Sequence, residues 1–577
     1  MPGGLLNLAA TGNQNVMIHG NPTKTFFKST YAKHTNFGMQ KFRIDFQGQR
    51  SLQLNTQTDL TFIVPRYADL LMDIYLVIDL PNIWSSVLPP DATADSPRNI
   101  WSPYEFKWIK NIGTNLIKEV RFTIGGHLIQ SYTGSYLQNV IERDFDENKK
   151  KLFDIMTGNT DELNDPAKFY NGNYPNAFNF NENSLTHEIL PSIRKKRLYI
   201  PINVWFTLMS KMAFPLISLQ YNELQIEFRL RPINELFVVR DIDHPNNYDY
   251  TQTPYIRANQ NMNRFQLFRF LEPPPSEKIS STSDNSYNSN INNWNSNIHI
   301  LANYCFLDND EVRIFTSKPQ QYLIKEFREY TYHELVGSNN VEIETNGLVS
   351  NFMFFFQRND IILRNEWSNY SNWQYQDQIP NIPERRINDL SIVSTSNGIK
   401  LNSNLDISQS LYDISMSYLM YFTKNYDTSL NTSIDYFIAN QKNILNEFAI
   451  LLDGKYRENL FSEGVYNYID YYIRSCGKGK EGLYFYNFGL GTNPFSNQPN
   501  GAINLAKFNR VEFQTNIIRP PLNPFAQVIE ICDDDGNLIG IEKTANNLHE
   551  YTFDLTVQEE RYNMLLFTNG NAQLMFA

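Results

Sequence analysis

The chain has 577 residues, of which 41% are hydrophobic, 14% aromatic and 19% charged. This length is too great for a single core, so two to three domains are expected. No run of 18 apolar residues occurs, so a membrane-spanning helix is not expected. The 50 basic and 61 acidic residues give a formal charge of −11, which repels a polyanion and argues against direct wrapping of a genome.

Aromatic and cysteine usage narrow the class further. The chain contains 34 Tyr and 40 Phe, and aromatic side chains suit the half-buried pleated surfaces of an all-β protein. The three cysteines, Cys305, Cys476 and Cys532, are far apart and odd in number. They argue against a disulfide framework and predict assembly in a reducing compartment such as the cytosol.

The first segment, residues 3–37, is predicted to be an extended arm. It lacks a basic leader, and its apolar cluster at residues 5–10 is much shorter than the core of a secretory signal. Turn-forming residues, among them Gly12, Gly20 and Pro22, interrupt it repeatedly. The segment is therefore expected to lie along neighbours rather than to fold by itself.

Short strand-like runs separated by turn signals follow the arm. The run VRFTIGGHLIQ at residues 120–130 alternates on both sides of Gly125 and Gly126, and paired glycines allow the positive φ angles of a two-residue hairpin turn. Pro201 suggests an edge or an irregular start for the strand in which it lies. Other predicted strands of this half cover residues 60–64, 70–80, 198–208 and 224–230.

The middle of the chain changes character. Beyond three consecutive prolines at 273–275, residues 281–297 are rich in Asn and Ser and bury too little apolar area to offset the entropy of ordering. The stretch from 231 to 297 is thus expected to contain a long exposed loop or a poorly ordered insertion. A strand at 298–307 and a helix-compatible connector at 308–318 follow.

A second strand-rich half begins at Tyr322. Residues 349–357, VSNFMFFFQ, predict a buried strand, whereas residues 365–443 are rich in Asn, Ser and Tyr and show only patchy periodicity. Because both halves consist of strands interrupted by long loops, two related sandwiches are predicted. Further strands are expected at 482–488, 506–518, 526–531, 538–542, 550–557 and 563–567.

The run ICDDDGNLIGIE at residues 531–542 has to be compared with a calcium-binding loop. With Gly536 at the sixth place, Glu542 falls at the twelfth, but Ile531 occupies the first, where a carboxylate is needed. The flanks read as strands, and turn chemistry explains the same acidic residues. A hairpin turn is the favoured interpretation.

Other clusters of reactive residues favour no site. Asp241, Asp243 and His244 could supply metal ligands, but carboxylates grouped in a loop are more often simply solvated. The GKGK run at 477–480 has the wrong spacing for a phosphate loop and lacks the hydroxyl that binds magnesium. The eight histidines are scattered without zinc-ligand spacing. No catalytic residue, cofactor site or metal ligand is therefore predicted.

The strongest basic run is RKKR at residues 194–197. Such a run serves in nuclear import or anion binding. Here it immediately precedes the strand predicted from Leu198, and basic residues commonly guard a strand end. The structural interpretation is favoured.

Two sites fit the acceptor pattern for N-linked glycosylation, Asn369 before Ser371 and Asn431 before Ser433. In a chain this rich in Asn, two such matches are expected by chance. Both are kept as candidate sites, which mark where sugars could be attached.

Several motifs carry a more specific likeness. The arm has a leading GGL, an NVxIxGNP step ending at Pro22 and a TFFK run at 25–28, and the segment QPNGAINLAKFNRVEF occupies residues 498–513. Together with the paired-glycine hairpin, these resemble the major capsid proteins of large icosahedral double-stranded DNA viruses. Ala506 and Lys507 depart from that family's signature, where serine and arginine are usual. Further similar segments lie at 196–202, 214–230, 302–315, 320–327 and 562–577.

The resemblance implies an all-β fold of two consecutive eight-stranded antiparallel jelly-roll sandwiches, a double jelly roll. The segments 231–297 and 365–480 show no match to the family and are expected to be long inserted loops. The expected domains are an extended N-terminal arm at 1–24, jelly roll 1 at 25–309, a connector at 310–320 and jelly roll 2 at 321–577.

The resemblance also implies a structural role without catalysis or a cofactor. Three chains in a closed ring would form a pseudo-hexagonal homotrimeric capsomer that tiles the icosahedral shell, with long loops outward and the arm inward. The expected partners are further copies of the chain, minor capsid and penton proteins and, through the arm, the inner viral membrane, but not nucleic acid. The protein would reside in the virion capsid after assembly in the host cytoplasm.

Two alternative functions stay open. A scaffold protein of the same double-sandwich lineage would shape immature virions and be absent from purified mature particles. The second alternative is a carbohydrate-binding β-sandwich protein, since lectins share the jelly roll. It would bind free sugar as a stable monomer of 67.4 kDa.

Overall fold

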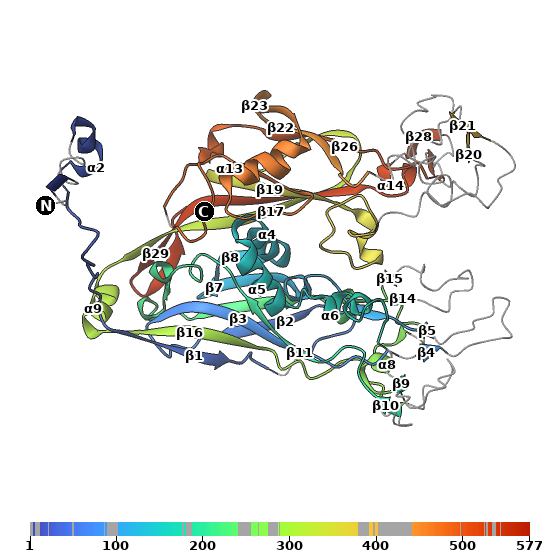
Figure 1. Cartoon of the computed structure of the whole chain (residues 1–577), viewed down its shortest axis with the longest axis horizontal. Coiled ribbons are helices and arrows are strands. Elements are labelled where there is room, and N and C mark those ends of the chain that lie inside the picture. The colour runs from blue at the N-terminus through green and yellow to red at the C-terminus, as the bar shows by residue number, and fades with distance from the viewer. Residues whose placement is uncertain are drawn as a thin grey trace.

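A computed structural model shows two stacked β-sandwiches with a segment at the N-terminus that extends away from them (Figure 1). The residues that it describes are 4–5, 12–20, 22–48, 51–85, 87–88, 102–175, 178–180, 187–240, 255–262, 265–274, 287, 289–378, 392–395, 398–401, 441–496, 498–523, 526, 529–532, 538–542 and 544–576.

The first sandwich consists of two antiparallel sheets. One has the strand order β1-β16-β3-β11, with β12 (Phe214–Pro215) beside β3, and the other has the order β2-β13-β7-β8. The bounds are β1 Phe37–Ile44, β2 Thr58–Ile63, β3 Leu70–Leu80, β7 Ile117–Ile124, β8 His127–Thr133, β11 Lys196–Pro201, β13 Leu224–Leu230 and β16 His299–Leu307.

The second sandwich is built in the same way. Its sheets have the orders β17-β29-β19-β24 and β18-β26-β22-β23, with β25 (Ile503–Asn504) beside β19 and β30 (Asn571–Leu574) beside β29. The bounds are β17 Gln320–Leu335, β18 Ser338–Glu342, β19 Leu348–Arg358, β22 Leu445–Leu452, β23 Lys455–Ser462, β24 Leu483–Asn487, β26 Val511–Ile517 and β29 Phe553–Thr568.

Both sandwiches repeat one strand order. Numbered along each sandwich, the main strands of the two sheets follow the orders 1-8-3-6 and 2-7-4-5 in both halves of the chain. This is the order of an eight-stranded jelly roll. The predicted all-β double jelly roll is confirmed.

Alternating side chains build each core. In β13 the residues Leu224, Ile226, Phe228 and Leu230 are all buried, while the residues between them are partly exposed, because successive side chains of a strand point to opposite faces. The second sandwich has its own cluster of buried aromatic rings, in which Phe354 of β19 stacks on Phe448 of β22 at 4.3 Å. Each half thus buries one face of every main sheet.

The paired-glycine turn is confirmed. Strands β7 and β8 pair antiparallel on either side of it, and Gly125 and Gly126 have φ angles of 57° and 83°. Residues with a Cβ rarely adopt these angles, which explains two adjacent glycines. Pro201 is the last residue of β11, an edge strand, where a missing N–H donor is tolerated.

Helices enter both sandwiches at the same place, between the fifth and sixth strands. In the first sandwich these are α4 (Gly134–Asp144), α5 (Glu147–Thr157), α6 (Asp161–Asn164) and α7 (Pro166–Phe169). In the second they are the π-helical turn η9 (Val465–Ile469) and α13 (Asp470–Arg474). The Thr133 hydroxyl accepts a hydrogen bond from the Tyr136 N–H and so caps α4.

A short helix connects the sandwiches. The helix α9 (Asn309–Ser317) follows β16 and precedes β17, and the side chain of Asp308 accepts from the N–H of Asn309 at its start. Asp310 and Glu311 lie in its first turn, where negative charge is favoured by the helix dipole. The helix-compatible segment predicted at 308–318 is therefore helical.

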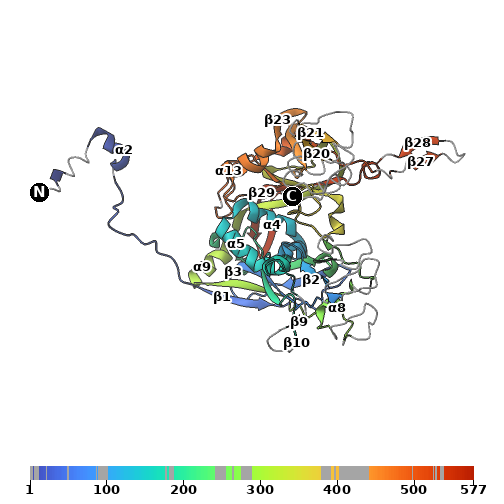
Figure 2. The ribbon, with the colours of Figure 1, turned by 45° about the vertical axis from the view of Figure 1, so that its right-hand side comes forward.

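Small sheets gather at the end of the molecule opposite the N-terminal segment (Figure 1). The hairpin of β27 and β28 projects furthest there (Figure 2). Their strands are β4 Val87–Leu88 with β5 Ser102–Pro103, β9 Phe178–Phe180 with β10 His187–Ile189, β20 Ile392–Thr395 with β21 Gly398–Leu401, and β27 Ile529–Cys532 with β28 Leu538–Glu542.

Two stretches expected to be loops contain packed structure. In 231–297, β14 (Phe237–Arg240) pairs with β6 (Phe106–Trp108) and β15 (Tyr255–Ile256), and α8 (Phe268–Leu271) follows. In 365–480 lie β22 and β23, two main strands of the second jelly roll. The expectation of long loops was wrong for these parts, because β14 and β15 are too short to show a strand pattern and β23 is exposed along almost its whole length.

The N-terminal segment makes two short helical turns, η1 (Asn13–Asn15) and α2 (Val16–His19), and then runs without regular structure to β1. It lies clear of both sandwiches (Figure 2), with Phe26 and Phe27 fully exposed. Among the described residues, no helix is long and apolar enough to cross a membrane.

Candidate functional site

The part of the chain that the structure describes contains no metal-ligand cluster. Within it, no three His, Cys, Asp or Glu side chains come together in a group that could hold a metal ion. The cluster at 241–244 and the acidic turn at 533–537 lie outside the described residues. The strands that flank that turn, β27 and β28, pair antiparallel, which agrees with a hairpin rather than with the helices of a calcium loop.

The GKGK run has a structural role. The N–H of Gly477 donates to the carbonyl oxygen of Arg143 and the N–H of Gly479 to that of Glu142, both at 2.8 Å. These bonds satisfy carbonyl groups at the C-terminal end of α4, which lack partners within the helix. The loop therefore joins the second sandwich to the first.

The basic run at 194–197 pairs within the first sandwich. Arg197 binds Asp79 of the neighbouring strand β3 with two hydrogen bonds of 2.6 and 2.8 Å, and Lys196 lies 3.3 Å from Glu162 of α6. The strand β11 begins at Lys196, so the run overlaps the strand end. This supports the structural interpretation of the run.

Of the two candidate glycosylation sites, Asn369 lies within the described residues. Asn369 is only 1% exposed, and its Nδ2 donates to the carbonyl oxygen of Trp373 at 2.8 Å. A sugar is attached to this same nitrogen, so the folded geometry disfavours modification there. Asn431 lies outside the described residues. Glycosylation of the chain stays a prediction.

The most unusual chemistry of the described chain lies between the sandwiches, where α4 packs against the sheet of β17, β29, β19 and β24 (Figure 1). Arg143 of α4 is 2% exposed and lies 2.8 Å from Glu560 of β29 and 2.6 Å from Asp144. Its Nη1 donates to Asn351 of β19 at 3.0 Å. One buried guanidinium thus binds groups from both halves of the chain.

Glu560 is the acidic centre of this network. Its carboxylate also accepts hydrogen bonds from Tyr136 at 3.0 Å and Asn351 at 2.9 Å, and Lys325 lies 3.5 Å away. Burial by itself raises the pKa of Glu560, but the charges of Arg143 and Lys325 and the Asn351 amide outweigh it and bring the pKa to about 2. The carboxylate is therefore fully ionised in the folded protein.

A second set of polar contacts extends the junction along the same strand. Gln558 of β29 accepts from Asn139 of α4 at 2.9 Å and donates to Glu329 of β17 at 2.9 Å. Thr133 donates to the same Glu329 at 2.8 Å. Beside these bonds the ring of Tyr136 lies 4.0 Å from that of Phe327. Polar and aromatic contacts together fix how the two sandwiches meet.

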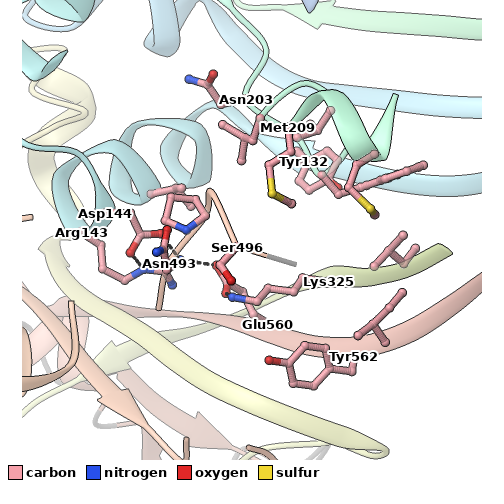
Figure 3. Close-up of a pocket in the computed structure, with 18 of the residues that line it drawn as sticks. Tyr132, Arg143, Asp144, Asn203, Met209, Lys325, Asn493, Ser496, Glu560 and Tyr562 are labelled. Atoms are coloured by element: carbon pink, nitrogen blue, oxygen red, sulfur yellow. Dashed lines mark hydrogen bonds and ion pairs between the residues drawn. The ribbon is translucent and has the colours of Figure 1, made fainter. Parts of the chain in front are cut away.

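The junction encloses only a small cavity (Figure 3). Its volume is about 80 Å³, which has room for a few water molecules but not for a substrate. The lining includes Tyr132, Arg143, Met209, Lys325, Glu560 and Tyr562. We therefore interpret the ionised cluster as a structural contact that holds the two sandwiches in a fixed relative position.

Sequence reasoning missed these residues. The run VQEERYN of β29, residues 557–563, places three charged side chains in succession within a strand, which is a detectable signal. Such a run is more often a solvated edge, and its partner Arg143 lies 417 positions away. The pattern could have raised the question of a buried network but not identified its partner.

Comparison with known proteins points to one family. Residues 25–308 match the family described as "Major capsid protein N-terminus". The major capsid protein of Phaeocystis pouchetii virus is 28% identical over 350 residues, covering 60% of this chain and 56% of that protein. Capsid protein 1 of Acanthamoeba polyphaga mimivirus is 25% identical over 340 residues, covering 59% and 46%. Over these regions the chain is similar to viral major capsid proteins.

Solved structures of major capsid proteins share the fold over nearly the whole chain. The capsid protein in the PBCV-1 virus capsid superposes with a TM-score of 0.55 at 16% identity, covering 96% of this chain and all of that one. The Faustovirus major capsid protein gives 0.56 at 11% identity, covering 97% and 94%. At these identities the likeness shows the fold alone.

Two further facts bear on function. The chain spans about half the length of the curated major capsid proteins that it matches. Those relatives are named as major capsid proteins of viruses, and such a structural role agrees with the prediction of a non-catalytic protein.

Proposed function

We propose that this protein is a structural major capsid protein that builds the icosahedral shell of a large double-stranded DNA virus. The observation that carries the proposal is the repeated jelly roll, locked into one block by the buried Arg143–Glu560 junction. Two equivalent sandwiches in a fixed relation give one chain two similar sides. Three such chains in a closed ring form a six-sandwich, pseudo-hexagonal homotrimer that tiles a flat facet.

The two ends of the molecule support an orientation in the shell. The N-terminal segment leaves one end and the small sheets project from the other (Figure 1). We infer that the small-sheet end faces outward and that the arm faces the inner side. There the arm contacts minor capsid and penton proteins or the inner viral membrane.

The charge of the arm supports an anionic partner. The segment 3–37 contains Lys24, Lys28 and Lys33 and no acidic residue, although the whole chain carries a charge of −11. Cationic side chains between exposed aromatic rings bind anionic lipid head groups or acidic proteins. The acidic remainder of the chain disfavours contact with the genome.

The proposed location is the virion capsid, with assembly in the host cytoplasm. Cys305 and Cys476 are free thiols, and Cys305 is buried. Thiols of this kind persist in a reducing compartment.

The test is the mass and shape of the purified protein. A trimer has a mass of 3 × 67.4 kDa, about 202 kDa, and electron microscopy should show roughly hexagonal particles with three-fold symmetry. A stable 67.4 kDa monomer that binds free sugar would instead support a carbohydrate-binding protein. A trimer found in immature but not mature virions would support a scaffold protein.

A further inference from the structure

The repeat between the sandwiches extends beyond their strands. In each sandwich the fifth strand is followed by a helix, and in each the sixth strand is followed by a short strand and a 3-10 turn before the seventh. The turn is η3 (Leu216–Ser218) in the first sandwich and η10 (Leu505–Lys507) in the second, and Leu216 and Leu505 are both buried. The helices α4 and α13 are thus equivalent elements of a repeated unit.

One face of α4 is covered within the chain. Tyr136, Asn139, Val140 and Arg143 recur at three- and four-residue spacing, so they form one stripe along the helix, and all four are buried. Tyr136, Asn139 and Arg143 contact the sheet of β17, β29, β19 and β24 through the bonds described above. The covering surface is the outer face of a 1-8-3-6 sheet.

The equivalent stripe of the second sandwich is exposed. Tyr468, Ile469, Tyr472 and Ile473 also recur at three- and four-residue spacing along η9 and α13, with exposures of 60%, 50%, 91% and 62%. Leu490, which follows β24 in the chain, is 80% exposed. Large apolar side chains grouped on one face of a folded protein mark an interaction surface. We call these five residues the α13 patch.

The edge strand beside the patch is exposed as well. In the first sandwich, β8 is held against β17: Gln130 donates to the carbonyl oxygen of Lys325 at 2.8 Å, and Tyr132 stacks on Phe327. Its equivalent β23 is an edge strand with seven of eight residues exposed. Tyr456, Leu460 and Phe461 are among them. These three apolar side chains extend the exposed apolar surface beyond the α13 patch.

The first sandwich has a sheet equivalent to the one that covers α4, and the outer face of this sheet is exposed. The other 1-8-3-6 sheet, β1-β16-β3-β11, forms the lower layer in Figure 1, at the opposite side of the molecule from β23. Its outer face presents Phe37 and Met39 of β1 and Tyr199 of β11, with exposures of 55%, 56% and 39%. We call this face the β1 face.

We infer that the α13 patch and β23 of one copy dock on the β1 face of the next copy, as α4 and β8 dock on the β17 sheet within the chain. The inference rests on the proposed function, since it assigns residues to the contact between capsomer chains. The two surfaces differ and lie on opposite sides, so the contact is heterologous and repeats around a ring until it closes.

Both surfaces present exposed apolar side chains, and the β1 face also carries Lys41, Arg43 and Arg197. The polar stripe of α4 meets the carboxylate and amide groups of Glu560 and Gln558, whereas the α13 patch carries aliphatic and aromatic side chains. The β1 face offers Phe37, Met39 and Tyr199 to such side chains. The occupant of each surface is therefore a second copy of this chain.

The first experiment removes one surface at a time from the full-length protein. Sedimentation should give about 202 kDa for the wild type and 67.4 kDa for the double variant Tyr472→Glu/Ile473→Glu, and likewise for Met39→Glu, with unchanged thermal unfolding of each chain. Leu363→Glu is the matched control, because Leu363 is 61% exposed and lies on neither surface. Charged variants that stay trimeric would overturn the inference while leaving the proposed function standing.

The second experiment maps the contact without depending on the variants' stability. A photo-crosslinking phenylalanine analogue replaces Tyr472 in one isotopically labelled pool, which is mixed with an unlabelled pool before reassembly. Crosslinks should join labelled and unlabelled chains and map to residues 37–44, 70–80, 196–201 or 299–307. Crosslinks that stay within one chain, or that map elsewhere, would contradict the inference. A wild-type monomer would contradict both the inference and the proposed function.

Discussion

Arg143 and Glu560, 417 positions apart in sequence, form a buried ion pair of 2.8 Å that joins the first sandwich to the second. Each side chain is 2% exposed. Both charges are almost fully removed from bulk solvent, so each depends on the other and on the polar groups around them. The relative position of the two sandwiches is thus set by a contact that only one arrangement satisfies.

Removing one partner of this pair should be costly. Arg143→Met leaves the carboxylates of Glu560 and Asp144 buried without their main cation, and the expected loss in unfolding free energy is about 3–5 kcal/mol. Arg43→Met is the control, because its pair with Asp45 is exposed and should contribute at most about 1 kcal/mol. Chemical denaturation measures both. Equal, small effects would show that the junction does not stabilise the fold.

The same network predicts acid sensitivity. The pKa of Glu560 is about 2 in the folded protein against an ordinary value of 4.5 for a glutamate, so the folded state binds this proton less readily than the unfolded state. Its contribution, roughly 3 kcal/mol, is fully present above pH 4.5 and is lost as the pH falls toward 2. Denaturation measured between pH 6 and pH 2 should show this loss. Glu560→Gln should flatten that part of the profile; an unchanged slope would contradict the assignment.

Local patterns were sufficient for much of the fold. Paired glycines predicted the β7–β8 turn, and alternation of apolar residues predicted strands such as β13 and β16, because these features depend on neighbours in sequence. The strand β23 was missed since its KYRENLFS sequence is exposed on both faces and shows no alternation. A strand whose apolar residues serve another surface has no core pattern to detect.

The junction was beyond sequence reasoning for a different reason. Charged residues in α4 and β29 look like solvated positions when each segment is considered alone. Their burial follows from the packing of one sandwich on the other, which depends on contacts between residues more than 400 positions apart. Only the folded chain shows that Arg143 and Glu560 meet.

Two glycines at equivalent helix starts should respond oppositely to alanine. At Gly134 a Cβ would lie 2.1 Å from the carbonyl oxygens of Thr114 and Ile117, so Gly134→Ala should cost about 1–3 kcal/mol. At Gly464 the nearest atom is a Tyr468 ring carbon at 3.5 Å and φ is −61°. Gly464→Ala should be neutral or stabilising by up to about 1 kcal/mol. Thermal unfolding compares the two; destabilisation by both would contradict the difference in packing.

The aromatic core of the second sandwich offers another test. Phe354 is fully buried and stacks on Phe448 and Tyr484, with centroid distances of 4.3 and 5.3 Å. Phe354→Ala should lower the unfolding free energy by about 3–5 kcal/mol. Phe27→Ala removes the same ring from a fully exposed position of the arm and should leave stability unchanged. A similar loss in both variants would show that the arm packs on the body.

The arm itself should matter for assembly and not for folding. Its described residues between 12 and 20 include Val16 and Met17, which are 70% and 89% exposed, and the segment lies clear of both sandwiches (Figure 2). Deleting residues 1–21 therefore removes no buried contact seen among the described residues, and the trimer should form with unchanged thermal unfolding. Closed shells, counted by electron microscopy when the variant replaces the wild type, should become rare because the arm's contacts on the inner side are lost. A deletion that abolishes the trimer would place the arm in the capsomer contact instead, and normal shells would show that assembly does not need it.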